Sequence, residues 1–256
     1  MTDFRFVRYA DDRDVVRISL ARPPLNILTI EMLDELGAAL ELAAARPALK
    51  ALVLGAEGKA FCAGVAVEDH LGARARRMLD AFHAVFRLMH DLDAVTVAVV
   101  QGAALGGGAE LATFCDVVVA DERATLGQPE IKVGVFPPIA ALHYPTRIGL
   151  TRTLRLLLTG EVLGAAEAER IGLVDRVAKT GALDEVLETE LGRLRALSAV
   201  VLRLTKRAVR EAHGLPFDHA LALLEELYHC ELMATADAEE GLRAFAEKRT
   251  PVWRDR

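Results

Sequence analysis

From the N-terminus to Ala120, the pattern of apolar and polar positions alternates between short continuous runs and helical spacing. The predicted elements are, in chain order, strands at 4–9 and 15–20, a helix at 30–45, a strand at 51–55, a helix at 74–92, and strands at 95–100 and 117–120. The first two strands flank a charged turn, Asp11-Asp-Arg-Asp14, and so predict a hairpin. The later strands are continuously apolar, as buried parallel strands are. Strands that alternate with helices indicate an α/β fold with right-handed crossovers.

From Thr151 onward the pattern is almost entirely helical. Helices are predicted at 152–158, 165–171, 183–197, 199–213, 217–233 and 236–248, with one strand at 173–177. The last two helices are amphipathic, and their apolar face suits either packing within the chain or contact with another subunit. No low-complexity linker divides the halves. We therefore expect an α/β core at 1–196 and a helical C-terminal region at 197–256.

Composition excludes several classes of protein. Of 256 residues, 52% are apolar and 27% charged, which excludes disorder as the main state. The net charge of −6 provides no positive field for nucleic acid. Cys62, Cys115 and Cys230 are too far apart for a disulfide framework or a CxxC pair, and the histidines show no ligand spacing, so no metal is expected. No run of about 18 apolar residues and no apolar leader segment occurs, so we expect no membrane association and a cytoplasmic location.

Two glutamates, twenty residues apart, are the strongest indication of chemistry. Glu110 follows three glycines, 106–108, at a junction between a predicted strand and a helix, and its neighbours are small or apolar. A glutamate in a first helical turn is usually solvated, but a carboxyl in apolar surroundings calls for a function. Glu130 lies in Gly127-Gln-Pro-Glu130, which taken alone could be a turn. Together the two carboxyls predict an acid/base pair.

The glycines before Glu110 indicate a second feature of the candidate site. They match neither GxGxxG nor a Gly-Lys-Ser/Thr loop, so a nucleotide site is disfavoured. The loop Phe61-Cys-Ala-Gly-Val65 also follows an apolar strand. If Val65 and Gly107 each present an amide to one oxygen, they form an oxyanion hole, in which each donor contributes about 3 kcal/mol in a transition state. Two alternatives stay open: the glycines only permit close packing, and the 61–65 loop is an ordinary connection.

Taken together, these residues resemble the enoyl-CoA hydratase/isomerase (crotonase) family over essentially the whole chain. The segments that carry the resemblance are 61–65, 101–111 with Cys115-Asp116, 126–131, 158–160, 168–174 and 244–249. The resemblance implies an α/β fold with a repeated ββα core and a helical C-terminal region for trimerisation. It also implies a homotrimer or a homohexamer built as a dimer of trimers. The implied substrate is an acyl-CoA thioester, and no cofactor is implied beyond the coenzyme A of that substrate.

The resemblance also assigns roles to individual positions. It implies that the amides of Val65 and Gly107 bind the thioester oxygen. Glu110 and Glu130 match the pair that orients and deprotonates water and protonates the α carbon. The implied CoA and substrate groove consists of Pro24, Leu25, Ala63, Gly64, Ala66, Val67, Gly106, Gly108, Phe136 and Pro137. Phe245 and Lys248 are implied to reach the CoA of a neighbouring subunit.

Within the family, three segments look like the cyclohexa-1,5-diene-1-carbonyl-CoA hydratase branch, which serves the degradation of aromatic acids. They are Glu68-Asp-His70, 127–138 and 202–207. At position 66 this chain has Ala66 where members of the family commonly carry an aspartate, which puts one contact near CoA in question. The apolar run 136–141 replaces a glycine-rich run, so the acyl pocket should differ from that of short-chain hydratases. Two rival functions remain, a double-bond isomerase that needs one glutamate and an RNA-binding crotonase homologue, which the acidic charge opposes.

Overall fold

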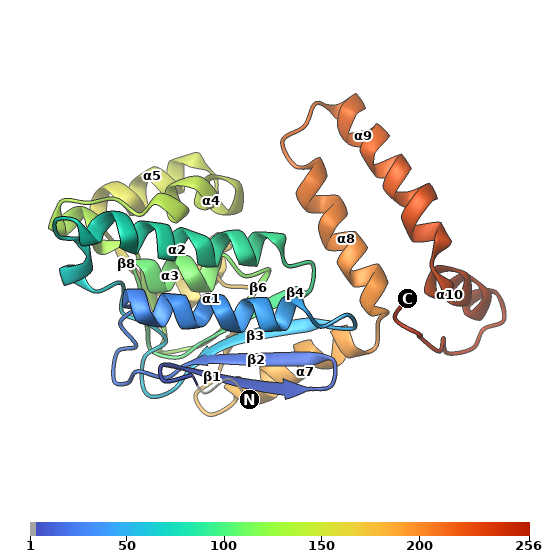
Figure 1. Ribbon diagram of the computed structural model, residues 1–256, viewed down its shortest axis with the longest axis horizontal. Coiled ribbons are helices and arrows are strands. Elements are labelled where there is room, and N and C mark those ends of the chain that lie inside the picture. The colour runs from blue at the N-terminus through green and yellow to red at the C-terminus, as the bar shows by residue number, and fades with distance from the viewer. Residues whose placement is uncertain (1–3) are drawn as a thin grey trace.

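The structure of the protein is a computed structural model that describes residues 4–256. Two sheets and the helices around them form a layered α/β body, from which a helical arm extends (Figure 1). The larger sheet has the order β1 (Val7–Asp12), β2 (Val15–Leu20), β3 (Ala51–Ala56), β4 (Val95–Val100), β6 (Val117–Asp121) and β9 (Arg176–Ala178). The smaller sheet has the order β5 (Ala103–Leu105), β7 (Thr125–Gly127) and β8 (Val162–Gly164). In the larger sheet, β1 pairs antiparallel with β2, and every other pairing is parallel.

Ten α-helices and four short helical segments occur in the described residues. The α-helices are α1 (Ile30–Ala44), α2 (Arg74–Asp91), α3 (Gly107–Thr113), α4 (Pro138–Ile148), α5 (Leu150–Thr159), α6 (Ala165–Ile171), α7 (Leu183–Arg195), α8 (Ala199–Ala212), α9 (Phe217–Glu226) and α10 (Ala236–Ala246). The short segments are the 3₁₀ helices η1 (Val67–His70), η2 (Pro129–Val133) and η4 (Leu232–Ala234), and the π-helix η3 (Leu227–Glu231). None of these helices is long and apolar enough to cross a membrane.

The core lies on both faces of the larger sheet. On one face, Leu52 and Leu54 of β3 pack with the apolar sides of α1 and α2. On the other face, Ala51 and Val53 pack against Leu187 and its neighbours on α7. Burial of both faces explains why the strands of this sheet read as continuous apolar runs. The predicted α/β fold is confirmed.

The body repeats a strand, strand, helix unit, and the second strand of each unit belongs to the smaller sheet. The order β4, β5, α3 and the order β6, β7, α4 are two such units, with η2 inserted in the second. Isolated bridges between Leu28 and Val65 and between Cys62 and Ala104 continue the pattern in the first half of the chain. This arrangement places the loop 61–65 beside the start of α3.

The last three α-helices form the arm, which Figure 1 shows extending away from the sheets. No residue of α9 is buried, and α8 buries only Ala199. A cavity of about 1490 Å³ lies where α8 faces α2 and α4. Its apolar lining includes Phe86, Leu142, Leu202 and Val209. The division of the chain into an α/β core at 1–196 and a helical region at 197–256 stays a prediction.

Several predicted elements differ from the structure. The first strand begins at Val7 rather than residue 4, and the strand predicted at 173–177 forms as β9 at Arg176–Ala178, after a loop at 173–175. The predicted helix 217–233 ends at Glu226 and continues as η3 and η4. The smaller sheet was not predicted, because strands of three residues are too short to show a period of two. Helix α4 was not predicted either, because it contains Pro138 and Pro145.

Candidate active site

The glycine segment allows two loops to touch at the start of α3. Gly106 has a φ of 53°, a left-handed conformation that a side chain would strain. A Cβ at Gly108 would lie 2.2 Å from the carbonyl oxygen of Cys62. The same carbonyl accepts the backbone N–H of Leu105 at 2.9 Å. The glycines therefore permit α3 to start directly against the loop 61–65.

Val65 and Gly107, the predicted oxyanion donors, lie side by side. Gly107 is the first residue of α3, so its N–H has no acceptor within the helix. A Cβ at Gly107 would lie 2.7 Å from Cγ2 of Val65 and 3.1 Å from the ring of Phe82. The structure thus brings the two residues together. Their joint action on one substrate oxygen stays a prediction.

Glu110 is buried in α3, as its small and apolar neighbours in the chain predicted. It is 2% exposed, and its Oε1 accepts the backbone N–H of Ala140 at 2.7 Å. Burial raises the pKa of Glu110 to about 8, although the N–H of Ala140 opposes this rise, and the nearby charge of Glu130 adds to it. Glu110 therefore keeps its proton at neutral pH.

Glu130 approaches the start of α3 from the segment η2. A Cβ at Gly106 would lie 2.8 Å from Oε1 of Glu130, so the missing side chain at 106 makes room for the carboxylate. The segment ends at Gly134, whose φ is 83°. Burial raises the pKa of Glu130 to about 7, and its own backbone N–H opposes the rise. Two glutamates twenty residues apart thus converge on one place, as the sequence predicted.

The two carboxyls form an electrostatically coupled pair. Each has a pKa raised to near neutrality, and the charge of Glu130 is one cause of the rise at Glu110. Their protons belong to the pair as a whole. Between pH 7 and 8 the pair holds about one proton, because Glu130 ionises before Glu110. Such a pair can take a proton from one atom of a substrate and deliver a proton to another.

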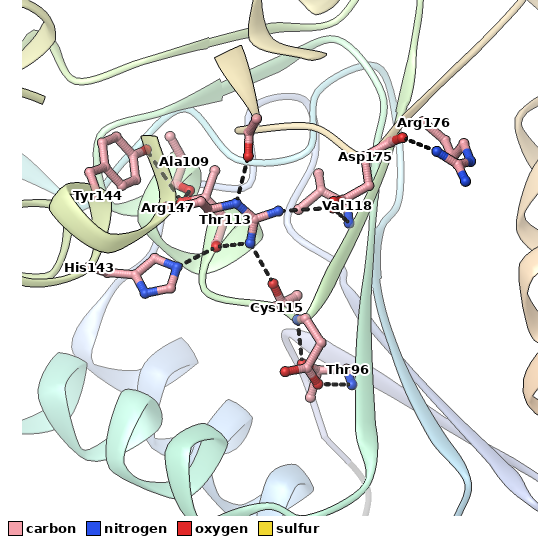
Figure 2. Close-up of polar contacts among 12 residues, drawn as sticks. Thr96, Ala109, Thr113, Cys115, Val118, His143, Tyr144, Arg147, Asp175 and Arg176 are labelled. Atoms are coloured by element: carbon pink, nitrogen blue, oxygen red, sulfur yellow. Dashed lines mark hydrogen bonds and ion pairs between the residues drawn. The ribbon is translucent and has the colours of Figure 1, made fainter. Parts of the chain in front are cut away.

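Helix α4 fixes the end of α3 that follows Glu110 (Figure 2). His143 Nε2 lies 3.0 Å from the carbonyl oxygen of Thr113, and Arg147 donates to the same oxygen at 3.0 Å. Arg147 also donates to the carboxylate of Asp175 at 2.9 Å. These contacts anchor α3, and with it the Glu110 carboxyl, to the rest of the body.

Sequence reasoning missed four groups near the pair. They are the backbone N–H of Ala140 and the side chains of Gln128, Tyr144 and Thr113, which lie close to Glu110 or Glu130. Gln128 lies two residues before a candidate carboxyl, and that position in the chain was the one available signal. The other three depend on the packing of α4 against α3, for which the sequence offered no pattern.

A second cavity, of about 420 Å³, lies beside the loop 61–65. Its lining residues are 22–27, Thr29, Ala66, Glu68 and Asp69. Asn26, which is fully buried, shapes this cavity: its Oδ1 accepts the N–H of Arg22 at 2.8 Å, and its Nδ2 donates to the carbonyl oxygen of Ala60 at 2.8 Å. The polypeptide therefore turns sharply here and opens a groove.

Three of the predicted CoA residues, Pro24, Leu25 and Ala66, line this groove. Ala63 joins them, because its N–H donates to the carbonyl oxygen of Leu25 at 2.9 Å. Gly64 follows Ala63 in the same loop, and Val67, at the start of η1, is 64% exposed. Gly106 and Gly108 lie at the glutamate pair instead. The groove thus lies next to the predicted oxyanion donors.

The remaining predicted residues fall into two places. Phe136 is 70% exposed in the loop after Glu130, and Pro137 caps the N-terminus of α4. Phe245, 86% exposed, lies at the end of α10, and Lys248 follows that helix. Figure 1 shows α10 in the arm, away from α3. One chain therefore does not bring Phe245 or Lys248 to its own glutamate pair.

The two buried cysteines offer no reactive thiolate, and the described residues offer no cluster of metal ligands. Burial raises the pKa of both Cys62 and Cys115 to about 12, so neither forms a thiolate near neutral pH. Among residues 4–256, no three His, Cys, Asp or Glu side chains are grouped so as to hold a metal ion. The two glutamates remain the candidates for proton transfer.

Comparison with known proteins gives a consistent picture. The sequence profile of the family described as enoyl-CoA hydratase/isomerase matches residues 11–256. The chain is 37% identical over 247 residues to a cyclohexa-1,5-dienecarbonyl-CoA hydratase of Thauera aromatica, which covers 96% of this chain and 95% of that protein. It is 38% identical over 251 residues to a probable enoyl-CoA hydratase of Mycobacterium bovis, with 96% of each covered. The crystal structure of an enoyl-CoA hydratase subunit I of Geobacillus kaustophilus aligns over both full chains, with a TM-score of 0.92 and 33% identity.

Proposed function

The chain belongs to the enoyl-CoA hydratase/isomerase family and is a hydratase, and we propose that Glu110 and Glu130 add water across a double bond conjugated with a CoA thioester. One observation carries this assignment. The carboxyl of Glu110 is buried and that of Glu130 is half-buried, and burial raises their pKa values to about 8 and about 7, so between pH 7 and 8 one is protonated while the other is ionised. Water addition needs both forms at once, because one proton leaves the water and another reaches carbon.

The proposed reaction proceeds through an enolate. The water oxygen bonds to the β carbon, its proton passes to the ionised carboxylate, and the π electrons move to the thioester oxygen. The amides of Val65 and Gly107 stabilise the negative charge on that oxygen. The protonated carboxyl then gives its proton to the α carbon as the carbonyl re-forms. The sum is one water added with no change in oxidation state, so we propose that no cofactor is needed beyond the CoA of the substrate.

For the acyl group, we propose a cyclic dienoyl thioester, which would place the enzyme in the degradation of aromatic acids. The similarity to the Thauera aromatica hydratase supports this choice, although the identity to a probable enoyl-CoA hydratase is as high. The loop after Glu130 gives a physical reason. Its Phe136-Pro-Pro-Ile139 is bulky and apolar, and it leads directly into Ala140, whose N–H binds Glu110. We propose that this bulky apolar segment, joined directly to the residue that binds Glu110, suits a ring better than a flexible linear chain.

We also propose that the groove beside Pro24 and Leu25 binds CoA, and that the arm packs against other copies of the chain in a trimer or a dimer of trimers. The unburied face of α9 and the large apolar cavity beside α8 support this assembly. The exposed Phe245, at the end of the arm, would then reach the CoA of a neighbouring subunit, as would Lys248.

The carboxyl assignment is tested with Glu110→Gln and Glu130→Gln. Each change keeps the size of the side chain but removes its ability to give or take a proton, so we expect each to lower kcat by about 100-fold or more. The matched control is Glu226→Gln, an exposed residue of α9, which should leave kcat unchanged. Near wild-type hydration by either active-site variant would contradict the pair. Incorporation of ¹⁸O from labelled water separates hydration from double-bond migration.

The acyl preference is tested separately with a panel of thioesters. Cyclic dienoyl-CoA and linear enoyl-CoA substrates are compared by kcat/KM, through the loss of ultraviolet absorbance of the conjugated thioester. We expect the cyclic dienoyl substrate to be preferred. Fast hydration of a short linear thioester with none of the cyclic one would reject the proposed acyl group and leave the hydratase assignment in place.

A further inference from the structure

A buried chain of three polar side chains leads from Glu130 to helix α3. Gln128 and Tyr144 are each 1% exposed, and Thr113 is fully buried. One end of the Gln128 amide lies 2.8 Å from the hydroxyl of Tyr144, and the other end lies 3.1 and 3.2 Å from the two carboxylate oxygens of Glu130. The Tyr144 hydroxyl is also 3.3 Å from Oγ1 of Thr113. Because these groups are cut off from water, their hydrogen bonds must be made to one another.

The charge on Glu130 decides the direction of these hydrogen bonds. An ionised carboxylate only accepts, so the Gln128 amide must turn its NH₂ group toward Glu130 and its oxygen toward Tyr144. The Tyr144 hydroxyl then donates to that oxygen. Burial raises the pKa of Tyr144 to about 12, so the hydroxyl keeps the proton that it donates. Figure 2 shows this hydroxyl beside Thr113, whose own proton goes to the carbonyl oxygen of Ala109 at 2.7 Å.

We propose that Tyr144 is a positioning residue for Glu130, because its hydroxyl holds the Gln128 amide with the NH₂ group directed at the carboxylate. The inference rests on the proposed function, in which Glu130 transfers a proton. A donor aimed at a carboxylate stabilises its ionised form and so opposes the effect of burial. The bond from Tyr144 also polarises the amide and makes its N–H a stronger donor. Loss of the hydroxyl leaves the amide oxygen buried without a donor, and so weakens the orientation that supports ionised Glu130.

The position of Tyr144 on α4 strengthens this inference. Tyr144 follows Ala140 by four residues, so both lie on the same face of the helix. The N–H of Ala140 binds Glu110, while the hydroxyl of Tyr144 acts on Glu130 through Gln128. One face of one helix thus sets the environment of both carboxyls.

The test is the pH dependence of kcat/KM for hydration in Tyr144→Phe, Gln128→Leu and the double variant. The ascending limb of the profile reports the first ionisation of the carboxyl pair. A hydrogen bond to a charged group is worth enough to move a pKa by about one pH unit, so Gln128→Leu should move this limb upward by about that amount. Tyr144→Phe should move it in the same direction by a smaller amount. Because Tyr144 acts through Gln128, the double variant should match Gln128→Leu alone.

Two further variants make the test specific. Tyr228→Phe, at a half-exposed position outside this network, is the matched control and should leave the limb in place. Incorporation of 3-fluorotyrosine at position 144 keeps the shape of the side chain but makes its hydroxyl a stronger donor, so the limb should move downward. This substitution also decides the matter if Tyr144→Phe fails to fold.

The outcomes separate this inference from the proposed function. The positioning role of Tyr144 is overturned if Tyr144→Phe leaves the ascending limb of the pH profile in place. It is also overturned if the shift in the double variant equals the sum of the two single shifts. An unmoved limb with 3-fluorotyrosine overturns this role as well. Wild-type activity in Glu130→Gln instead overturns the proposed function itself, because the reaction would then need no proton transfer at Glu130.

Discussion

Replacement of Glu110 by glutamine should make the protein more stable while it removes activity. The wild-type carboxyl is 2% exposed, and burial raises its pKa from the ordinary 4.5 to about 8. At high pH the folded protein must therefore hold a buried negative charge, or keep a proton that the unfolded chain has already released. A glutamine at 110 resembles the protonated carboxyl at every pH, and its amide oxygen still accepts the N–H of Ala140.

The size of the effect follows from the linkage between protonation and folding. Because the folded-state pKa is the higher one, the folded protein binds the proton more tightly, and wild-type stability falls as the pH rises from 4.5 toward 8. A pKa difference of one pH unit corresponds to about 1.36 kcal/mol. The full difference at Glu110 amounts to roughly 5 kcal/mol above pH 8, which is an upper bound because local relaxation and water entry reduce it. A gain of at least about 1 kcal/mol is expected there, and almost none at pH 4.5.

Urea unfolding of the wild type and Glu110→Gln at pH 5 and pH 8.5 measures this difference. For a chain of this size, each kcal/mol corresponds to about 2–4 °C in Tm, so thermal unfolding gives an independent measurement. Glu226→Gln on the exposed surface of α9 is the control, and its stability relative to wild type should be the same at both pH values. A gain for Glu110→Gln that is equal at pH 5 and pH 8.5, or no gain at pH 8.5, would refute the assignment of a buried carboxyl with a raised pKa.

Two further predictions concern the junction and the arm. Gly108→Ala should lower stability by about 1–3 kcal/mol and abolish most activity, because its Cβ would lie 2.2 Å from the Cys62 carbonyl oxygen. Gly192→Ala within α7, which meets no atom within 4 Å, should instead raise stability by up to about 1 kcal/mol in the same denaturant experiment. Val209→Asp, on the cavity beside α8, should reduce the size of the assembly in analytical ultracentrifugation. Val252→Asp, equally exposed but outside that cavity, should not, and identical sedimentation of the two variants would contradict the proposed role of the arm.

The sequence was most informative where burial alone determines the pattern. The strands of the larger sheet are buried on both faces, so their apolar runs appear directly in the sequence. Glu110 was recognisable for a related reason, because a single carboxyl among small and apolar residues is conspicuous. Gly107 and Val65 were recognisable because each follows a predicted strand, and parallel strands bring such loops to one edge of a sheet.

The elements that could not be predicted from the sequence depend on contacts between distant segments of the chain. Strand β7 has three residues and is defined by its pairing with β5 and β8, which lie far from it in sequence. The prolines at the start and near the end of α4 argue against a helix there, yet Pro138 occupies the first turn, where no N–H is required. Once α4 was missed, so were the N–H of Ala140 and the hydroxyl of Tyr144. The two candidate glutamates were visible in the sequence, but the groups that adjust the pKa values of these glutamates were not.

The position of α4 has a consequence for how substrate preference and acid/base balance are related. The loop that ends at Ile139 leads without a break into Ala140, which binds Glu110, and one helical turn later into Tyr144, which contacts Gln128. A change in the length or bulk of this loop would therefore shift the start of α4 together with its hydrogen bonds to the carboxyl pair. Because a hydrogen bond weakens steeply as its geometry is lost, even a small shift would change the pKa of Glu110. In the proposed function this loop lines the acyl pocket, so the pocket and the proton balance of the site are coupled through one helix, and a substitution made to alter substrate preference should also move the pH profile.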